Sequence, residues 1–137
     1  MNALDQVAVI PRVLRGDGRG WLLKLMDGTE PTLAERFGEI YIVMARPGHV
    51  RANHYHPKTS EWFTLVQGTA LLKVADPESR EQREIRLHAA EPQTVFVPAG
   101  IAHGFKNPDD SSGDFLLVAY ADHPYDPFDT VAFELFP

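Results

Sequence analysis

The chain has 137 residues, of which 44% are apolar and 23% are charged, and its formal net charge is −6. These values exclude a disordered chain and are typical of a folded domain, so we expect one domain over residues 1–137. The negative charge argues against nucleic acid as a partner, and the absence of cysteine excludes disulfides and thiolate metal sites.

Membrane and export signals are absent from the sequence. No stretch approaches about 18 uninterrupted apolar residues, which argues against a transmembrane helix. Residues 1–14 lack a basic start followed by a long apolar run, which is the pattern of a secretory signal. We therefore expect a cytoplasmic protein with no membrane partner.

The first half of the chain carries signals of several short strands. Residues 6–13 are apolar and β-branched, and a glycine-rich turn at 16–20 separates them from a second apolar stretch at 21–26, which predicts a hairpin. Residues 31–38 predict a single helical turn, because proline stands near its start and glycine after its end. Residues 40–44 predict the next strand.

Strand signals continue through the second half. An extended run at 54–56 is broken by Pro57, and residues 61–66, a Gln-Gly turn and residues 70–74 predict a second hairpin. Four further strands are predicted at 83–87, 95–97, 103–106 and 115–120. About ten short strands separated by turns, with almost no helical period, indicate an all-β sandwich or small barrel.

One stretch near the middle of the chain carries the clearest chemical signal. His54 and His56 are two residues apart, and Glu61 follows five residues after them. On a β-strand, residues i and i+2 face the same side, so both imidazoles can point at one spot. Two imidazoles and a carboxylate form most of a metal site, and we nominate His103 as the fourth ligand.

Two motifs around these residues resemble those of the cupin superfamily. The first, G-x5-H-x-H-x4-E-x6-G, is matched at every fixed position, by Gly48, His54, His56, Glu61 and Gly68. The second, G-x5-P-x-G-x2-H-x3-N, is matched by Pro98, Gly100, His103 and Asn107, while Pro92 replaces its leading glycine. The resemblance implies a cupin jelly-roll barrel, or double-stranded β-helix, in which the three histidines and Glu61 bind a divalent metal.

The identity of the metal stays open at this point. Three imidazoles and one carboxylate suit Zn, Fe, Mn, Ni and Cu. Zn is favoured for non-redox chemistry, because it acts as a Lewis acid without electron transfer. A cupin that keeps these residues without binding metal is the alternative.

Shorter motifs resemble the cupins of nucleotide-sugar metabolism. Residues 17–20 are similar to the D-x-R-G opening of dTDP-4-dehydrorhamnose 3,5-epimerases and sugar 3,4-ketoisomerases, and residues 100–105 resemble the epimerase stretch GFAHGF. Residues 121–130 are similar to the metal-binding epimerase domain of bifunctional capsular-polysaccharide epimerase/reductases. The resemblance implies a metal-dependent epimerase or isomerase acting on a nucleotide-linked 4-keto sugar in polysaccharide or glycoside biosynthesis. An Fe(II) oxygenase and a non-catalytic sugar- or small-molecule-binding cupin are the alternatives.

The resemblance also bears on oligomeric state. Cupins of this size are commonly dimers, so we expect a homodimer. The aromatic segment at residues 125–136 fits that expectation, because it can cover a sheet or a partner subunit. Packing of this segment into the core is the simpler interpretation.

An epimerase of this kind needs a base that removes a proton next to the ketone. Metal-free rhamnose epimerases use a histidine that corresponds by resemblance to a position near His54. Because we expect His54 to bind metal, the base must be another group, and the candidates are Tyr120, Lys73 and His88. His49 and His123 are expected to be ordinary packed or exposed residues. The same holds for His88 if it is not the base.

Basic residues are concentrated in the first part of the chain. Residues 1–60 carry eight Lys and Arg against six acidic residues, whereas residues 61–137 carry five against thirteen. An anionic ligand would therefore meet mainly the first part. Arg51, Lys58 and Arg19 are the candidates to bind a diphosphate through charge-assisted hydrogen bonds, and solvated surface cations are the alternative interpretation.

Overall fold

Strands account for almost all the regular structure of the chain. The structure, a computed structural model, describes residues 2–30 and 37–137. These residues contain twelve β-strands and two short 3-10 helices, η1 (Ala3–Gln6) and η2 (Pro127–Asp129). The strands are β1 (Ala8–Pro11), β2 (Leu14–Asp17), β3 (Gly20–Leu23), β4 (Glu39–Ala45), β5 (Val50–Tyr55), β6 (Glu61–Gln67), β7 (Thr69–Ala75), β8 (Gln82–His88), β9 (Gln93–Val97), β10 (Ala102–Lys106), β11 (Phe115–Ala121) and β12 (Val131–Ala132). The predicted all-β class is confirmed.

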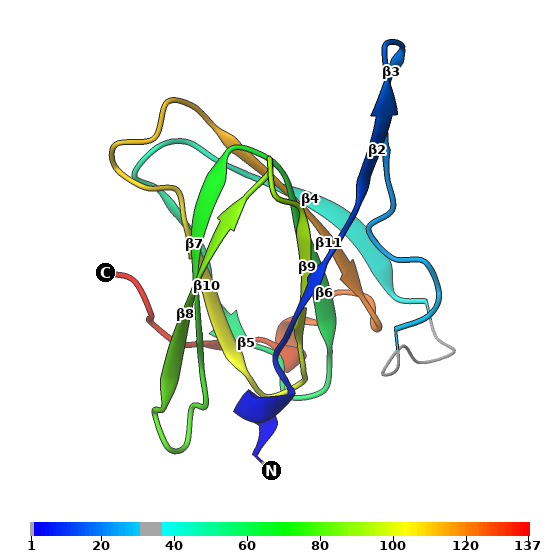
Figure 1. Cartoon of the computed structure of the whole chain (residues 1–137). Coiled ribbons are helices and arrows are strands. Elements are labelled where there is room, and N and C mark those ends of the chain that lie inside the picture. The colour runs from blue at the N-terminus through cyan, green and yellow to red at the C-terminus, as the bar shows by residue number, and fades with distance from the viewer. Residues whose placement is uncertain (1, 31–36) are drawn as a thin grey trace.

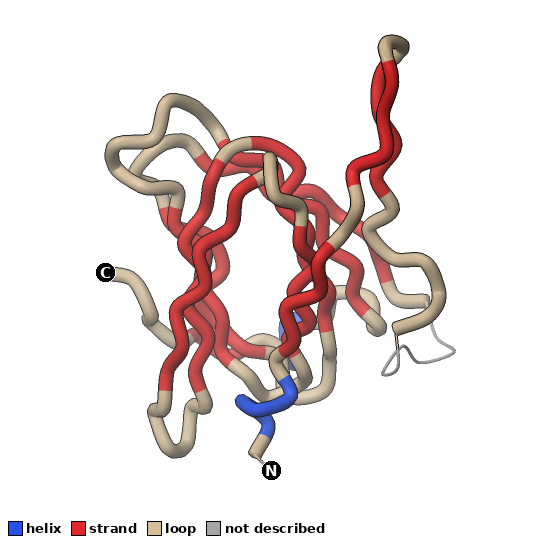
Figure 2. Tube along the Cα trace, in the orientation of Figure 1, coloured by secondary structure: helices blue, strands red, loops and turns tan. Residues whose placement is uncertain are grey.

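Two five-stranded antiparallel sheets face each other and form a jelly-roll barrel (Figures 1 and 2). The β6 sheet has the strand order β1-β9-β6-β11-β4, and the β10 sheet has the order β12-β5-β10-β7-β8. From β4 onward, consecutive strands mostly lie in different sheets, so the chain crosses between the two layers as jelly rolls do. The cupin fold expected from the motifs is therefore confirmed.

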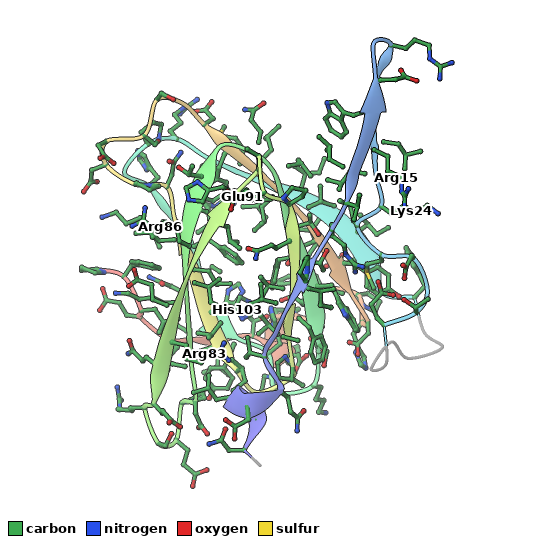
Figure 3. All side chains as sticks on the ribbon, in the orientation of Figure 1. Arg15, Lys24, Arg83, Arg86, Glu91 and His103 are labelled. Carbon is green, nitrogen blue, oxygen red and sulfur yellow. The ribbon has the colours of Figure 1, made fainter. Side chains whose placement is uncertain are left out.

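Apolar side chains from both sheets fill the space between them. Phe63 and Leu65 of β6, Leu72 of β7 and Phe105 of β10 belong to one buried cluster and are each at most 2% exposed. Burial of such a side chain contributes about 1.5–3 kcal/mol. The ring of His103 lies 5.3 Å from that of Phe63, between the two sheets (Figure 3). Core packing therefore fixes one of the predicted metal ligands.

The predicted N-terminal hairpin is present but shifted along the chain. β2 pairs with β3, whereas residues 8–11 of the predicted first arm form β1 and pair with β9 in the β6 sheet. The chain leaves that ladder at Arg12, whose guanidinium donates to Glu30 and to Thr94. The β2–β3 hairpin projects away from the barrel (Figure 1).

The second predicted hairpin, residues 61–66 with 70–74, is wrong. The two segments form β6 and β7, but β6 pairs with β9 and β11 while β7 pairs with β8 and β10. Gly68 alone links the strands and has a φ of +83°, a left-handed conformation that glycine adopts without strain. One residue is too short for a two-residue hairpin turn, so the chain turns a corner into the other sheet.

The C-terminal tail lies over the β10 sheet. β12 pairs with β5, and Leu135 and Phe136 are buried together with Ala75 and Ala102. The expectation that the tail covers a sheet is therefore confirmed.

Other predictions can be placed in the same way. Five predicted strands are confirmed, those at 40–44, 83–87, 95–97, 103–106 and 115–120. The helical turn predicted at 31–38 lies mostly outside the described residues. Within the described ranges, no helix has the length and apolar character needed to cross a membrane.

Candidate metal centre and its pocket

A bulge in β5 positions His54. Ala52 and Asn53 have positive φ values of 69° and 57°, and the ladder to β10 pairs His103 with His54 but Gly104 with Ala52. Asn53 is thus the extra residue of a β-bulge, which bends the strand and redirects the side chains beside it. Backbone strain of this kind costs about 1–3 kcal/mol per residue and is concentrated at functional sites.

The side chain of Asn53 holds the bulge in place. Its Oδ1 accepts hydrogen bonds from the backbone N–H groups of Leu135 and Phe136, both at 3.3 Å, and its Nδ2 donates to the carbonyl of Phe136 at 2.8 Å. Gly104 leaves room for this amide, because a Cβ there would lie 2.4 Å from Asn53 Oδ1. The tail is therefore anchored to the strand that carries His54.

Three strands bring the four predicted ligands together. His54 lies on β5, His56 directly after it, Glu61 begins β6 and His103 lies on β10. Their ligand atoms all lie within 4.8 Å of one another. Oε1 of Glu61 is 3.1 Å from Nε2 of His56 and 3.4 Å from Nε2 of His103. The convergence expected from their spacing is present, and metal binding itself stays a prediction.

Backbone carbonyls orient two of the imidazoles. Nδ1 of His56 donates to the carbonyl of Asp129 at 2.8 Å, and Nδ1 of His103 donates to the carbonyl of Ile101 at 3.1 Å. A carbonyl only accepts, so Nδ1 carries the proton and a neutral ring presents Nε2 as a lone pair. Metal-ligating histidines are commonly fixed in this way.

Two buried acceptor atoms of the cluster have no hydrogen-bond donor, and this suits the binding of a cation by the four residues. Among the buried side-chain atoms that the structure describes, Oε1 of Glu61 and Nε2 of His103 make no hydrogen bond, although they face each other. Buried polar atoms are normally paired, and two facing lone pairs need a proton or a cation between them. Three imidazole nitrogens and one carboxylate oxygen suit divalent metals such as Zn, Fe and Ni.

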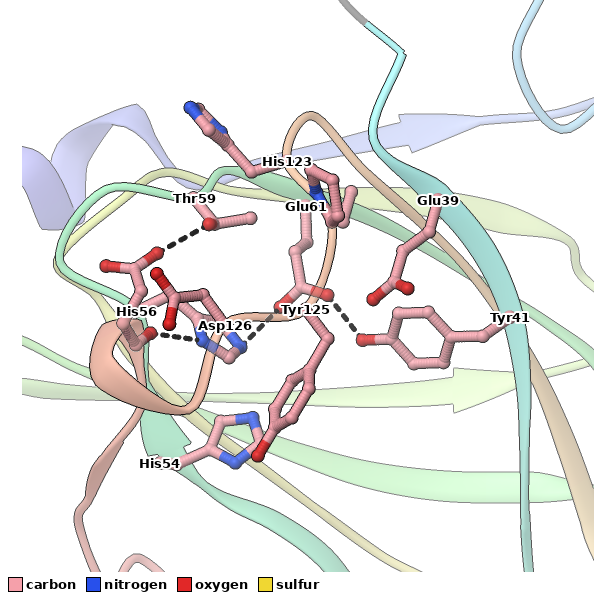
Figure 4. A pocket seen from close by; sticks show the side chains of 12 residues that line it. Glu39, Tyr41, His54, His56, Thr59, Glu61, His123, Tyr125 and Asp126 are labelled. Atoms are coloured by element: carbon pink, nitrogen blue, oxygen red, sulfur yellow. Dashed lines mark hydrogen bonds and ion pairs between the residues drawn. The ribbon is translucent and has the colours of Figure 1, made fainter.

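Tyr41 on β4 holds the other oxygen of the glutamate. Its hydroxyl donates a hydrogen bond to Oε2 of Glu61, as Figure 4 shows. Burial raises the pKa of Tyr41 above its ordinary value, and the negative charge of Glu61 raises it further. The phenol therefore stays protonated and keeps Glu61 in one orientation.

Burial and charge set the protonation of the cluster. Burial, and then the neighbouring His103 and His56, lower the pKa of His54 to about 4, so this ring is neutral at pH 7. Burial disfavours the ionised form of Glu61, but the close imidazoles of His103 and His56 and the hydrogen bond from Tyr41 outweigh burial and hold the pKa of Glu61 below its ordinary value. Burial likewise opposes the charge on His56, yet the nearby carboxylate of Glu61 outweighs burial and raises the pKa of His56. A cation bound here would compete with a proton on His56.

The cluster borders two cavities. The first, of about 240 Å³, is lined by His54, His56 and Glu61 and also by Glu39, Tyr41, Thr59, Asp129 and residues in the segment 121–126 (Figure 4). The second, of about 230 Å³, lies beside β4 and β5, and its lining includes Tyr41, Arg51, His54 and His103. His54 and Tyr41 line both cavities, so the site can be approached from two sides.

The three predicted base candidates are not among the residues that line these two cavities, and their role as base stays a prediction. The ring of Tyr120 lies 5.6 Å from that of Trp62 on the outside of the β6 sheet. Nζ of Lys73 lies 4.5 Å from the ring of Phe136, under the tail. His88 is exposed on β8. The physical reason is alternation, because neighbouring residues of a strand face opposite sides of the sheet.

The predicted anion-binding residues are separated from one another. Arg51 lines the second cavity and donates from Nη1 to the carbonyl of Met44. Lys58 is exposed in the loop between β5 and β6. Arg19 stands at the tip of the β2–β3 hairpin, in an exposed ion pair with Asp17 at 2.8 Å. Of the three, Arg51 alone borders the described cavities that meet the metal centre.

Sequence reasoning missed four groups that shape the site. Tyr41 and Glu39 lie on the strand predicted at 40–44 or next to it, and the carbonyl of Asp129 orients His56. His123, expected to be ordinary, lines the first cavity and contacts Asp122 at 2.6 Å. The two-residue spacing of Glu39 and Tyr41 was the available signal, because it puts both on one face of a strand.

Comparison with known proteins finds a sequence relative that covers most of the chain. The chain is similar to the spore coat polysaccharide biosynthesis protein SpsL of Bacillus subtilis, with 28% identity over 108 residues, which are 75% of this chain and 71% of that protein.

Solved structures of the same fold include enzymes named for dTDP-linked sugars. The dTDP sugar isomerase of Desulfovibrio desulfuricans has a TM-score of 0.82 and 19% identity, over 93% of this chain and 83% of that one. The dTDP-6-deoxy-D-glucose-3,5-epimerase of Legionella pneumophila has a TM-score of 0.83 and 17% identity, over 96% of this chain and 74% of that one. The capsular polysaccharide assembling protein CapF of Staphylococcus aureus has a TM-score of 0.68 and 21% identity over 91% of this chain. The chain spans 35% of the CapF chain.

The family assignment rests on most of the sequence. The family model of the polysaccharide biosynthesis C-terminal domain matches residues 15–133. This range includes the strands of both sheets that carry His54, His56, Glu61 and His103. The chain therefore belongs to the polysaccharide biosynthesis C-terminal domain family.

Proposed function

We propose that this protein is a metal-dependent epimerase or isomerase acting on a nucleotide-linked 4-keto sugar. The observation that favours this function most is the cluster of three histidines and one glutamate beside an open cavity. Structures of the same fold are named as a dTDP sugar isomerase and a dTDP-sugar 3,5-epimerase. The family name points to polysaccharide biosynthesis, which consumes nucleotide sugars.

The chemistry of a 4-keto sugar suits such a site. Protons at carbons 3 and 5 are acidic, because removing either one leaves an enolate whose charge rests on the ketone oxygen. A divalent cation held by His54, His56, Glu61 and His103 would stabilise that charge as a Lewis acid, and zinc is the favoured metal. Reprotonation from the opposite face inverts the carbon.

The residues of the chain itself orient the ligands and receive the substrate. Tyr41 fixes Glu61 through Oε2, which leaves Oε1 directed at the imidazoles. Arg51 lines the second cavity beside His54, and a guanidinium has five N–H donors, so it can bind a phosphate while it donates to a carbonyl. A nucleotide sugar would then lie with its diphosphate near Arg51 and its sugar at the metal centre.

Hydrogen exchange at carbon tests the proposed function. Zinc-loaded protein is incubated in deuterated water with dTDP-4-keto-6-deoxyglucose or its UDP-linked counterpart, and deuterium at carbons 3 and 5 is followed by mass spectrometry. We expect label to enter one or both positions, and the rate to fall at least about 100-fold in His56→Ala. No exchange into either sugar with Zn, Fe, Mn or Ni would contradict the function.

An Fe(II) oxygenase is the second candidate. Three imidazoles and one carboxylate also bind Fe(II) and leave coordination positions for oxygen. Oxygen consumption that depends on added iron would support this candidate. Full sugar exchange activity under anaerobic conditions would exclude it as the main function.

We also propose that two copies of the chain associate through the outer face of the β6 sheet. On β4, Ile40, Ile42 and Met44 are 60%, 67% and 38% exposed. They lie opposite Tyr120, Val118 and Leu116 of β11, which are half-buried on the same face. An exposed apolar face of this kind is typical of a protein interface.

The β2–β3 hairpin supplies a second apolar surface. Trp21 and Leu22 are 62% and 54% exposed, and the hairpin projects away from the barrel (Figure 1). A two-stranded hairpin is only marginally stable alone in water, so a partner surface would stabilise it. A second copy presents the same two surfaces and could bury both in a symmetric dimer. Light scattering should give twice the chain mass of 15.3 kDa, and a single-chain mass would contradict the dimer.

A further inference from the structure

A row of residues across the β6 sheet leads from the candidate metal centre to a second carboxylate. Glu39 on β4 lies directly opposite Ala121 on β11, and Ala121 lies directly opposite Glu61 on β6. Directly opposed residues of antiparallel strands point to the same face of the sheet. Neighbouring strands are about 4.8 Å apart, so the Cα atoms of the two glutamates are roughly 10 Å apart.

Ala121 keeps the space between the two glutamates open. Its side chain is a single methyl group, and it lines the same cavity as Glu39 and Glu61. Figure 4 shows the carboxylate of Glu39 directed into this cavity, towards Tyr41 and Glu61. A substrate in the gap would have the metal ligands on one side and Glu39 on the other.

Two other carboxylates of this cavity already have partners, those of Asp129 and Asp126. Asp129 accepts a hydrogen bond from the hydroxyl of Thr59 at 2.6 Å. Asp126 accepts the backbone N–H of Phe128 at 2.9 Å, as the cap of η2. These carboxylates hold the loop that forms the rim, so moving a proton onto either one would weaken that loop.

His123 has a partner within the chain, whereas the carboxylate of Glu39 has none among the described residues. His123 contacts Asp122 at 2.6 Å, and Figure 4 shows its ring directed away from Glu61. Within residues 2–30 and 37–137, the carboxylate of Glu39 makes no hydrogen bond or ion pair. Its side chain is half-buried and borders the cavity. Glu39 is therefore the carboxylate at this site with no evident structural task.

Tyr41 and Glu61 are poorly suited to accept a proton from substrate. Oε2 of Glu61 accepts from Tyr41, and Oε1 faces the imidazoles of His56 and His103. The hydroxyl of Tyr41 is committed as the donor in that bond. Proton transfer therefore falls to a group on the far side of Ala121.

We propose that Glu39 is the general base of the reaction, a role that rests on the proposed function. Glu39 removes the proton from a carbon next to the ketone: the C–H bond breaks, its electron pair forms the C=C bond of the enolate, and the carbonyl π pair moves to oxygen. The proton goes to a carboxylate oxygen of Glu39. Glu39 then releases this proton to water, and a solvent proton adds to carbon, from the same face in simple exchange or from the opposite face in epimerisation, so no oxidant or reductant is needed.

Deuterium exchange into dTDP-4-keto-6-deoxyglucose by the zinc-loaded protein tests this role. Gln at position 39 keeps the size of the side chain but cannot take up the proton, so Glu39→Gln should slow exchange by about 100-fold or more. Its zinc content should equal that of the wild type. Glu84→Gln, on the exposed strand β8, removes a carboxylate away from the cavity and should exchange at the wild-type rate.

Chemical rescue distinguishes a base from a structural residue. Glu39→Ala leaves space in a cavity of about 240 Å³ that is open to solvent, where formate can take the place of the lost carboxylate. We expect added formate to raise the exchange rate of Glu39→Ala several-fold and to leave Glu84→Gln unchanged. Loss of exchange together with loss of zinc, without rescue by formate, would overturn the role as base.

The remaining outcomes separate this role from the proposed function. A wild-type exchange rate in Glu39→Gln would overturn the role of Glu39 and leave the proposed function standing. Absence of exchange in the wild-type protein would overturn the function, and the role of Glu39 with it.

Discussion

The first cavity with the candidate metal centre, here called the barrel mouth, and the outer face of the β6 sheet share strand β4. They differ in whether their side chains find partners within the chain. On β4, Glu39 and Tyr41 line the cavity at the mouth, whereas Ile40 and Ile42 face outwards and are mostly exposed. At the mouth, hydrogen bonds within the chain hold polar groups such as Tyr41 and His56 in place. On the outer face, apolar side chains lie in solvent.

The difference indicates what each region still needs. At the mouth, the described buried atoms without hydrogen bonds include Oε1 of Glu61 and Nε2 of His103, which a single cation would satisfy. On the outer face, the exposed side chains of Ile40 and Ile42 spread over an area that only another protein surface would cover. Alternate residues of β4 face the cavity or the outer face, so a substitution can disrupt one region and leave the other unchanged.

The largest expected effect is loss of metal from the mouth in Glu61→Gln. The amide keeps the hydrogen bond from Tyr41 but carries no charge, so we expect zinc affinity to fall at least about 100-fold. Competition with a chromophoric chelator measures the affinity, and light scattering should show an unchanged oligomer. Glu91→Gln, an exposed carboxylate, is the matched control. Wild-type zinc affinity in Glu61→Gln would remove Glu61 from the ligand set.

The second prediction breaks the outer face and spares the mouth. Ile42→Arg places a charge on the apolar surface, and we expect the dissociation constant of the dimer to rise at least about tenfold. Zinc affinity should not change, because the side chain of Ile42 is 67% exposed on the outer face and, although Ile42 borders the second cavity, it does not line the first one. Gln82→Arg adds the same charge on exposed β8 and should leave the dimer intact. An unchanged dimer in Ile42→Arg would place the interface elsewhere.

The candidate metal ligands could be predicted from the sequence because they lie in short motifs with fixed spacing along the chain. His54 and His56 are two residues apart at the end of β5, and the motif around His103 fixes a short turn before β10. Glu39 could not be found in this way. Its position beside Glu61 depends on how β4 pairs with β11 and β11 with β6, and the chain does not encode these pairings locally.

The wrong hairpin has a similar cause. A strand, a glycine and a second strand are the same local signal whether the chain folds back in one sheet or turns a corner between two. The choice is made by the partners that β6 and β7 find later in the chain. The positions of two base candidates have a related explanation, since Tyr120 and Lys73 lie on barrel strands but face away from the two cavities.

A third prediction concerns the bulge that supports the mouth. Gly104→Ala places a methyl group against Oδ1 of Asn53, so we expect the free energy of unfolding to fall by about 1–3 kcal/mol and the melting temperature by several degrees. In an Asn53→Gly background Oδ1 is absent and the positive φ is kept, so the same substitution should cost less. A double-mutant cycle by thermal denaturation measures the difference. Equal costs in both backgrounds would mean that Gly104 is not required by this contact.

The smallest expected effect concerns Arg12, which precedes the β2–β3 hairpin and contacts Glu30 and strand β9 of the β6 sheet. Nη2 of Arg12 is 2.7 Å from Oε1 of Glu30, and Nε of Arg12 donates to Thr94 of β9. Burial alone would raise the pKa of Glu30. Backbone hydrogen bonds and the charge of Arg12 outweigh burial and hold this pKa below its ordinary value.

A carboxyl with a lowered pKa in the folded state stabilises the fold at pH values above its unfolded pKa, about 4.3, and loses that contribution as pH falls through the folded pKa. Glu30→Gln removes the titrating group, so wild type should exceed it in unfolding free energy by about 1 kcal/mol at pH 7. The difference in melting temperature should shrink as pH falls below about 4. The zinc affinity of both proteins should be equal at pH 7. A pH-independent difference would mean that Glu30 acts through packing, because only the charge on its carboxylate titrates in this range.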